Sequence, residues 1–149
     1  RFDAPRDLRA VLFIPDVRLS THDMRAALPA DVPLADAVAN LGRVAIGVAG
    51  MALGRFDLLR VLMVDRLHEP YRAKAFPQLP ALVNAARRAG AIGACLSGAG
   101  STVLAFSDSV RTITRIEAAF GAAAADTDLT GRIAVVSPRN VGAHVVKRP

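Results

Sequence analysis

The sequence predicts an α+β fold, a two-layer sandwich in which helices cover one face of an antiparallel sheet. Four short apolar runs have the length and composition of buried strands, and segments with helical periodicity separate them. The chain has 149 residues, of which 52% are hydrophobic and 21% charged, so it can form one domain with a core.

Local signals define the first two elements. Residues 8–14 (LRAVLFI) form an apolar run that a Pro-Asp pair stops, which indicates a buried strand. Ser20 or Thr21 then caps a brief helix that Pro29 ends.

Residues 33–54 carry apolar side chains at helical spacing and predict a long core helix that ends at Gly54. Gly42, Gly47 and Gly50 lie inside it, although each costs up to about 1 kcal/mol relative to Ala. We therefore expect a neighbouring element to approach the helix closely at these three glycines.

Further elements follow in order. An amphipathic helix is predicted over residues 56–67, and three prolines in residues 68–80 predict an irregular but ordered loop. Another helix over residues 79–89 ends at Gly90 and leads into a β-hairpin over residues 91–106.

The turn of this hairpin is rich in glycine and consists of Ser97, Gly98, Ala99, Gly100 and Ser101. Gly98 and Gly100 can adopt positive φ at little steric cost, and successive amides around them could form a nest that binds an anion. From spacing alone a plain strand connection is favoured, because the segment lacks the strand-to-helix GxGxxG context and the GxxxxGK[ST] pattern.

Asp108 is expected to cap a helix that stops near Gly121, and the alanine run at residues 122–125 either continues it or forms a loose link. Residues 131–136 predict a strand, and residues 141–146 a further strand at the sheet edge. A ferredoxin-like topology is the natural candidate for this element order.

Composition narrows the classes of partner. The net charge is +6, but the basic residues are spread along the chain, and there is one Tyr and no Trp. This pattern disfavours nucleic acid and favours a small anionic ligand. The lone Cys95 in an apolar run indicates an inert thiol in a cytoplasmic protein.

No membrane association is predicted, since the chain has no uncharged apolar run of 18 residues and no signal peptide. The chain begins with Arg rather than Met and enters a strand almost at once, as a piece of a longer protein would. No metal site is predicted, because His22, His68 and His144 lie far apart in the sequence.

Arginines are the more informative polar residues. Thr21 and Arg25 fall on one face of the first short helix, and Arg72 lies in the proline-rich loop. Two guanidinium groups that converge on one anion would hold a carboxylate or phosphate. Solvated surface arginines are the alternative, which the sequence alone favours. A triad of Ser97 and His68 with an Asp has little support, because no GxSxG elbow is present.

Four segments resemble the GHMP kinases, in that family's order. Residues 93–106 (GACLSGAGSTVLAF) resemble its third, glycine-rich signature. Residues 14–25, 27–45 and 65–72 (DRLHEPYR) are similar in particular to the members that phosphorylate L-homoserine. The combination spans roughly residues 8–106 and is far more specific than any one segment.

The resemblance implies ATP-dependent phosphorylation of the hydroxyl group of L-homoserine, in threonine biosynthesis, with Mg²⁺. By matching position, Thr21, Arg25 and Arg72 would recognise the amino acid, with both arginines on its carboxylate. The loop from Ser97 to Ser101 would lie against the phosphate-transfer site, where its amides help to position phosphate. No residue of this chain is expected to be a catalytic base or a metal ligand.

The chain departs from the family pattern in two respects. Ser101 stands where the family usually has Pro, which predicts a less rigid turn. The family's N-terminal half, with the PxxxGLGSS loop and the Mg²⁺ ligand, is not in this chain, so residues 1–149 are expected to form a single C-terminal domain. We expect this domain alone to lack kinase activity and to expose an apolar face toward its N-terminal domain, which favours association or a swapped homodimer.

Two alternatives stay open. Another GHMP kinase could act on mevalonate or a sugar alcohol, although paired arginines fit a carboxylate better than a neutral sugar. A stand-alone amino-acid-binding regulatory module of ferredoxin-like fold would belong to a different class.

Overall fold

The computed structural model of the chain describes residues 2–143 and 145. Its elements, in chain order, are β1 (Arg9–Pro15), α1 (Thr21–Ala26), α2 (Leu34–Leu53), α3 (Phe56–Leu62), α4 (Glu69–Arg72), α5 (Leu79–Arg88), β2 (Gly93–Leu96), β3 (Val103–Ser107), α6 (Val110–Ala125) and β4 (Gly131–Val136). The strands form one antiparallel sheet in the order β2-β3-β1-β4. The predicted α+β sandwich is therefore confirmed.

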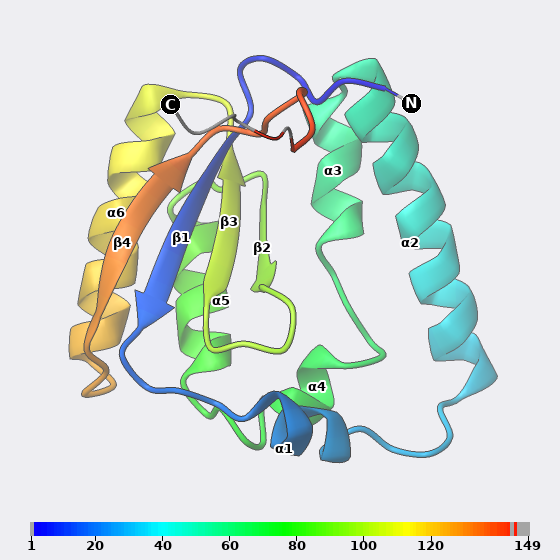
Figure 1. Cartoon of the computed structure of the whole chain (residues 1–149), viewed down its shortest axis with the longest axis vertical. Coiled ribbons are helices and arrows are strands. Elements are labelled where there is room, and N and C mark those ends of the chain that lie inside the picture. The colour runs from blue at the N-terminus through cyan, green and yellow to red at the C-terminus, as the bar shows by residue number, and fades with distance from the viewer. Residues whose placement is uncertain (1, 144, 146–149) are drawn as a thin grey trace.

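Helices α5 and α6 cover one face of the sheet and lie behind the strands in Figure 1. Val11 and Phe13 of β1 and Val103 of β3 point into this layer and are at most 2% exposed. The Phe13 ring meets Phe120 of α6 at 6.0 Å between centroids. This layer is the main hydrophobic core, and it makes the sheet a rigid platform for the loop at the end of β2.

The opposite face of the sheet is also apolar. Strand alternation places Leu12 and Ile14 of β1 and Leu104 of β3 on this face, and all three are half-buried. Among the described elements, no helix lies over this face at β1 and β4 (Figure 1). The fold thus has one sheet face closed by its own helices and one apolar face largely without them.

Helices α2 and α3 form an antiparallel pair beside the β2 edge of the sheet (Figure 1). A Cβ atom added at Gly47 would lie 2.3 Å from Leu62 Cβ, and one added at Gly50 would lie 2.7 Å from Leu58 Cβ. The predicted close approach is confirmed at these two glycines. It is wrong at Gly42, where no atom lies within 4 Å of the added Cβ.

The description of α2 as a core helix is wrong for this domain. Only Gly47 and Gly50 are buried among its residues, and its large apolar side chains other than the half-buried Met51 are exposed. Helical periodicity shows that a face is apolar, but it cannot show that the partner of that face lies in the same chain. By length and composition α2 meets the size of a membrane span, and 11% of that apolar stretch is buried.

Three helix boundaries differ from the sequence prediction. The helix predicted over residues 56–67 ends at Leu62, and residues 68–80 contain α4 instead of only irregular loop. Ser109, not Asp108, caps α6, because its hydroxyl oxygen accepts a hydrogen bond from the Thr112 amide at 3.2 Å.

Two other helix ends agree with the sequence prediction, whereas the last predicted strand does not. The alanine run continues α6 to Ala125, which resolves the two alternatives for that segment. Gly54 ends α2 with a φ of +65°, as predicted. The strand expected over residues 141–146 is not present at residues 141–143, and His144 and Val146 lie outside the described residues.

Replacing glycines of α2 by alanine tests the packing of the α2–α3 pair. Gly47→Ala forces the helices apart, because Leu62 Cβ is part of the α3 packing surface and cannot swing away, and we expect it to lower the free energy of unfolding by about 1–3 kcal/mol. Gly42→Ala is the matched control: it lies in the same helix with open space around it, and should raise stability by up to about 1 kcal/mol. Urea denaturation measures both. Equal effects of the two substitutions would contradict the close approach.

Candidate functional site

The glycine-rich turn between β2 and β3 is a closed hairpin loop. The Ser97 amide donates to the Thr102 carbonyl at 2.8 Å, and the Gly100 amide donates to the Ser97 carbonyl at 3.1 Å. Gly98 and Gly100 have φ of +61° and +99°, which confirms the predicted positive values. A side chain at either position would be strained, so the loop depends on both glycines.

Three amides of this loop remain available to a ligand. Within the described residues, no hydrogen bond is found from the backbone N–H groups of Gly98, Ala99 or Ser101. Unused amides of a turn are suited to an anion, and those of Gly98 and Ala99 are in successive residues. The Ser101 hydroxyl donates to the Val17 carbonyl at 2.7 Å and so ties the loop to the segment after β1. This bond restrains the turn at Ser101, where the sequence analysis predicted a less rigid turn.

A groove of about 470 Å³ lies beside this loop, between residues 14–19 and residues 100–102. Of the three residues with an available amide, only Ser101 lines this groove.

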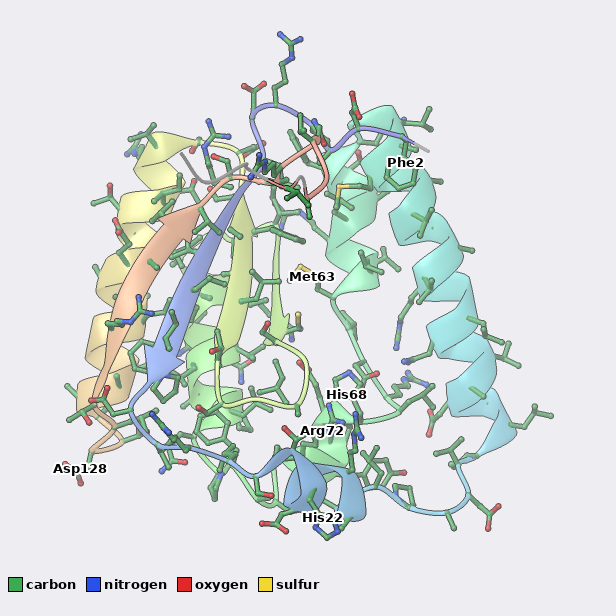
Figure 2. All side chains as sticks on the ribbon, in the orientation of Figure 1. Phe2, His22, Met63, His68, Arg72 and Asp128 are labelled. Atoms are coloured by element: carbon green, nitrogen blue, oxygen red, sulfur yellow. The ribbon has the colours of Figure 1, made fainter. Side chains whose placement is uncertain are left out.

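Arg72, the last residue of α4, connects three segments. Its Nη1 group donates to the Gly98 carbonyl at 2.7 Å, and its Nε group donates to the Met24 carbonyl of α1 at 3.2 Å. Nη1 also lies 3.4 Å from His68 Nδ1, and Figure 2 shows the two side chains side by side above α1. The Nη2 group has no partner among the described residues. One guanidinium therefore holds α1, α4 and the loop together and keeps a donor free.

Thr21 and Arg25 lie at the two ends of α1, four residues apart and on one face, as predicted. Both residues are exposed, and no hydrogen bond or ion pair of the Arg25 side chain is found in the part of the chain that the structure describes. Arg72 bonds to the carbonyl of Met24, the residue next to Arg25. The structure thus places α1 against Arg72, and through Arg72 it links α1 to the loop.

Asp65 fixes the start of α4. Its Oδ2 accepts hydrogen bonds from the amides of His68 (2.6 Å) and Glu69 (2.7 Å), and its Oδ1 accepts one from Asn40 Nδ2 of α2 at 2.7 Å. Burial of this carboxyl favours its neutral form, but the three donors outweigh burial and lower the pKa of Asp65. Asp65 therefore joins α2 to the helix that carries Arg72.

Glu69 anchors the other side of α4. Its Oε1 accepts a hydrogen bond from the amide of Leu96, the residue before the glycine-rich loop. Burial raises the pKa of Glu69 despite this bond. Burial, with the nearby Glu69 charge, also raises the pKa of the Cys95 thiol to about 12, so this cysteine stays protonated at neutral pH.

A second cavity, of about 470 Å³, lies between the α2–α3 pair and the open face of the sheet. Its walls are mostly apolar, including Val44, Leu62 and Phe106, and Asp65 and His68 lie among its lining residues. Glu69 and Leu96 also line it, so it borders the candidate site, but no residue of the loop at positions 97–101 is among its lining residues.

The described residues offer amide donors at the loop but no cluster of metal-type ligands. No group of three or more His, Cys, Asp or Glu side chains suited to a metal is found among residues 2–143 and 145.

Sequence reasoning missed the supporting residues Asn40, Asp65 and Glu69. Asp65 had a local signal. An acidic residue just before a helix often accepts hydrogen bonds from the free amides of the first turn, and a Pro in that turn marks where α4 begins. The hydrogen bond from Asn40 to Asp65 joins residues 25 positions apart, and the bond from the Leu96 amide to Glu69 joins residues 27 positions apart. No local pattern could have indicated them.

The family model described as "GHMP kinases C terminal" matches residues 47–126. This chain belongs to the GHMP kinase C-terminal family. Among curated relatives, it is 40% identical to a homoserine kinase from Moorella thermoacetica over 98% of this chain and 49% of that protein. It is 45% identical to a homoserine kinase from Persephonella marina over 71% of this chain and 35% of that protein. The chain spans about half the length of the Moorella relative.

Solved structures agree with this placement. The chain superposes on the crystal structure of homoserine kinase from Cytophaga hutchinsonii with a TM-score of 0.87 and 30% identity, over 92% of this chain and 44% of that one. It also resembles L. major mevalonate kinase in complex with R-mevalonate, with a TM-score of 0.65 and 18% identity, over 88% of this chain and 43% of that one. The second likeness shows the shared fold alone.

Asp65→Asn tests whether the carboxylate holds α4 in place. The amide keeps the shape but loses the charge that the three donors stabilise, and we expect the free energy of unfolding at pH 7 to fall by about 1–2 kcal/mol. Because the pKa of Asp65 is lowered in the folded state, its contribution is complete above the ordinary value of 3.8 and is lost as the pH falls through the folded-state pKa.

Denaturant unfolding of both proteins at pH 7 and pH 3 measures this difference. The gap between Asp65→Asn and the unmodified protein should narrow at pH 3. Asp57→Asn, whose carboxylate is exposed and paired with Arg55, is the control and should change the free energy of unfolding far less than Asp65→Asn does at pH 7. A gap that does not change with pH would contradict the assignment.

Proposed function

We propose that this chain is the C-terminal, substrate-binding half of an ATP-dependent homoserine kinase of the cytoplasm, which phosphorylates the side-chain hydroxyl of L-homoserine in threonine biosynthesis. The observation that carries the proposal is the convergence of α1, α4 and the glycine-rich loop on Arg72, in a chain whose similar proteins include homoserine kinases.

Substrate recognition would use the free donors around α1. Arg25 and the Nη2 group of Arg72 would bind the carboxylate of L-homoserine, and the Thr21 hydroxyl would accept or donate a hydrogen bond at its amino acid end. An Arg fork gives such a carboxylate both charge and direction. The distal hydroxyl group would then point toward the loop of residues 97–101.

Phosphoryl transfer would occur beside this loop. The hydroxyl oxygen of homoserine would form a bond to the terminal phosphorus of ATP, the bond from that phosphorus to ADP would break, and the hydroxyl proton would pass to water. The unused amides of Gly98, Ala99 and Ser101 would stabilise the phosphate oxygens. This chain supplies position and donors, and Mg²⁺ with most of the ATP site would belong to an N-terminal half.

We assign the open face of the sheet to that N-terminal half. The half-buried Leu12, Ile14 and Leu104 form an apolar surface that ends near the loop, so a domain seated on it would reach the site.

Other kinases of the family are the nearest alternative. Mevalonate also carries a carboxylate, so the arginines alone do not separate it from homoserine, whereas a sugar alcohol has no anion for them. Turnover assays with L-homoserine, mevalonate and a sugar alcohol at equal concentration decide between the three. Preferred turnover of either of the last two would replace the substrate assignment and keep the family.

A stand-alone regulatory module would differ in its gene. An upstream PxxxGLGSS segment in the reading frame supports the kinase, and a different fused enzyme supports the module.

Arg25→Ala and Arg72→Ala in the full-length enzyme test the carboxylate assignment. Each should raise the KM for L-homoserine far more than the KM for ATP, with a loss of about 1.5–3 kcal/mol in transition-state binding. Arg25→Ala should leave the unfolding midpoint unchanged, whereas Arg72→Ala should lower it, because Arg72 also bonds to Met24 and Gly98.

Arg111→Ala, an exposed arginine of α6, is the control and should change neither KM. Unchanged homoserine KM in both variants would refute the assignment.

A further inference from the structure

His68 immediately precedes α4, and its ring lies against the guanidinium group of Arg72. The two residues are four positions apart, so their side chains share one face of the short helix. Arg72 Nη1 lies 3.4 Å from His68 Nδ1, and Figure 2 shows both side chains together above α1. No step of the proposed phosphoryl transfer uses this histidine.

The backbone of His68 is held on both sides. Its amide donates to Asp65 Oδ2 at 2.6 Å, and its carbonyl accepts hydrogen bonds from the amides of Tyr71 and Arg72 at 3.2 and 2.9 Å. The side chain is 35% exposed, and the ring lines the cavity between the α2–α3 pair and the open face of the sheet. These main-chain bonds limit how far the ring can move from Arg72.

The two ring nitrogens of His68 face charged groups of opposite sign. Nδ1 faces the Arg72 guanidinium, and Nε2 lies 3.6 Å from Asp65 Oδ1. A guanidinium group can only donate, so a hydrogen bond from it requires Nδ1 to be the unprotonated nitrogen. The ring proton is then on Nε2, where it faces a carboxylate. The contacts therefore assign the neutral Nε2–H tautomer to His68.

The acceptors around Arg72 account for three of the five N–H donors of an arginine side chain. Nε donates to the Met24 carbonyl at 3.2 Å. One Nη1 hydrogen is directed to the Gly98 carbonyl at 2.7 Å, and His68 Nδ1 accepts the other. The Nη2 hydrogens have no acceptor within the described residues. His68 thus takes the last Nη1 donor and leaves Nη2 as the free end of the guanidinium.

The same contacts distinguish a positioning residue from a general base. A base needs a ring nitrogen that is free to take the proton of the attacking hydroxyl group. In the part of the chain that the structure describes, Arg72 stands at one ring nitrogen and Asp65 at the other. No hydrogen bond between His68 and Ser97 is found there, so the described residues do not form the triad that the sequence supported only weakly.

We propose that His68 is a positioning residue for substrate binding, whose neutral ring accepts a hydrogen bond from Arg72 Nη1 and so presents Nη2 to the carboxylate of the amino acid substrate. The Asp65 carboxylate holds the ring from the other side. A planar guanidinium with three directed donors keeps its remaining donors in a fixed direction. This role rests on the proposed function, because His68 acts through the arginine that would bind the carboxylate.

Steady-state kinetics of the full-length enzyme test the proposal. His68→Leu removes the acceptor and should raise the KM for L-homoserine about fivefold, as expected for one lost hydrogen bond. The KM for ATP and kcat should stay unchanged, because the lost contact serves ground state and transition state alike. His68→Asn is the matched control: its side-chain oxygen can replace Nδ1 as the acceptor, and it should restore the KM for L-homoserine.

The same substitution in an Arg72→Ala background shows whether His68 acts through Arg72. His68→Leu should have no further effect on the homoserine KM there, since the guanidinium that it orients is gone. An equal effect in both backgrounds, or an unchanged KM in His68→Leu beside a raised KM in Arg72→Ala, would overturn the role of His68 and keep the carboxylate assignment. An unchanged KM in Arg72→Ala would refute the carboxylate assignment and, with it, this role of His68.

Nitrogen-15 NMR of the full-length protein labelled at histidine reads the tautomer without substrate, and it decides even if His68→Leu does not fold. The His68 signals, identified by their loss in His68→Asn, should show a protonated Nε2 and an unprotonated Nδ1 at pH 8. A ring that carries its proton on Nδ1 at that pH would contradict the hydrogen bond from Arg72 and overturn the proposal.

Discussion

The Arg72 guanidinium bonds to two backbone carbonyls that are 74 residues apart, those of Met24 and Gly98. Arginine is suited to this role, because its rigid planar fork keeps several donors in fixed directions. One of the two carbonyls belongs to the helix that carries Thr21 and Arg25, and the other to the glycine-rich loop. The geometry of the candidate site depends on this side chain, and the position of the side chain depends on α4.

Helix α4 is only four residues long and could not stand alone. Two carboxylates compensate for its length. Asp65 accepts hydrogen bonds from the two amides at the start of α4, and Glu69 accepts one from the Leu96 amide at the end of β2. The Asp65 carboxylate also accepts a hydrogen bond from Asn40 of α2. Side chains therefore connect α2 to the loop beside which phosphate would be transferred.

Much of the fold could be predicted from the sequence, because its signals are local. The apolar run before Pro15, the Ser20 cap and the glycines of the hairpin each act within a few residues, and each prediction is confirmed. The role of α2 could not be predicted in this way. Its apolar face is visible in the sequence, but whether that face is buried depends on a partner surface.

In the candidate site, too, local features could be predicted from the sequence and long-range contacts could not. Thr21 and Arg25 could be placed on one helix face from their spacing, and the loop from its glycines. The hydrogen bonds that bring Arg72 to both of them span 48 and 26 residues, which no local pattern encodes. The similarity to GHMP kinases supplied the grouping of these segments, and the structure supplies the contacts within it.

The most direct test of the carboxylate claim is calorimetric binding to the full-length protein of L-homoserine and of 3-amino-1-propanol, which lacks only the carboxylate. The unmodified protein should prefer L-homoserine by roughly 100-fold or more, because an arginine pair would face no anion in the analogue. In Arg25→Ala, whose side chain makes no described bond within the fold, most of that preference should disappear. An Arg25→Ala protein that keeps the full preference for L-homoserine would contradict the claim that Arg25 binds the substrate carboxylate.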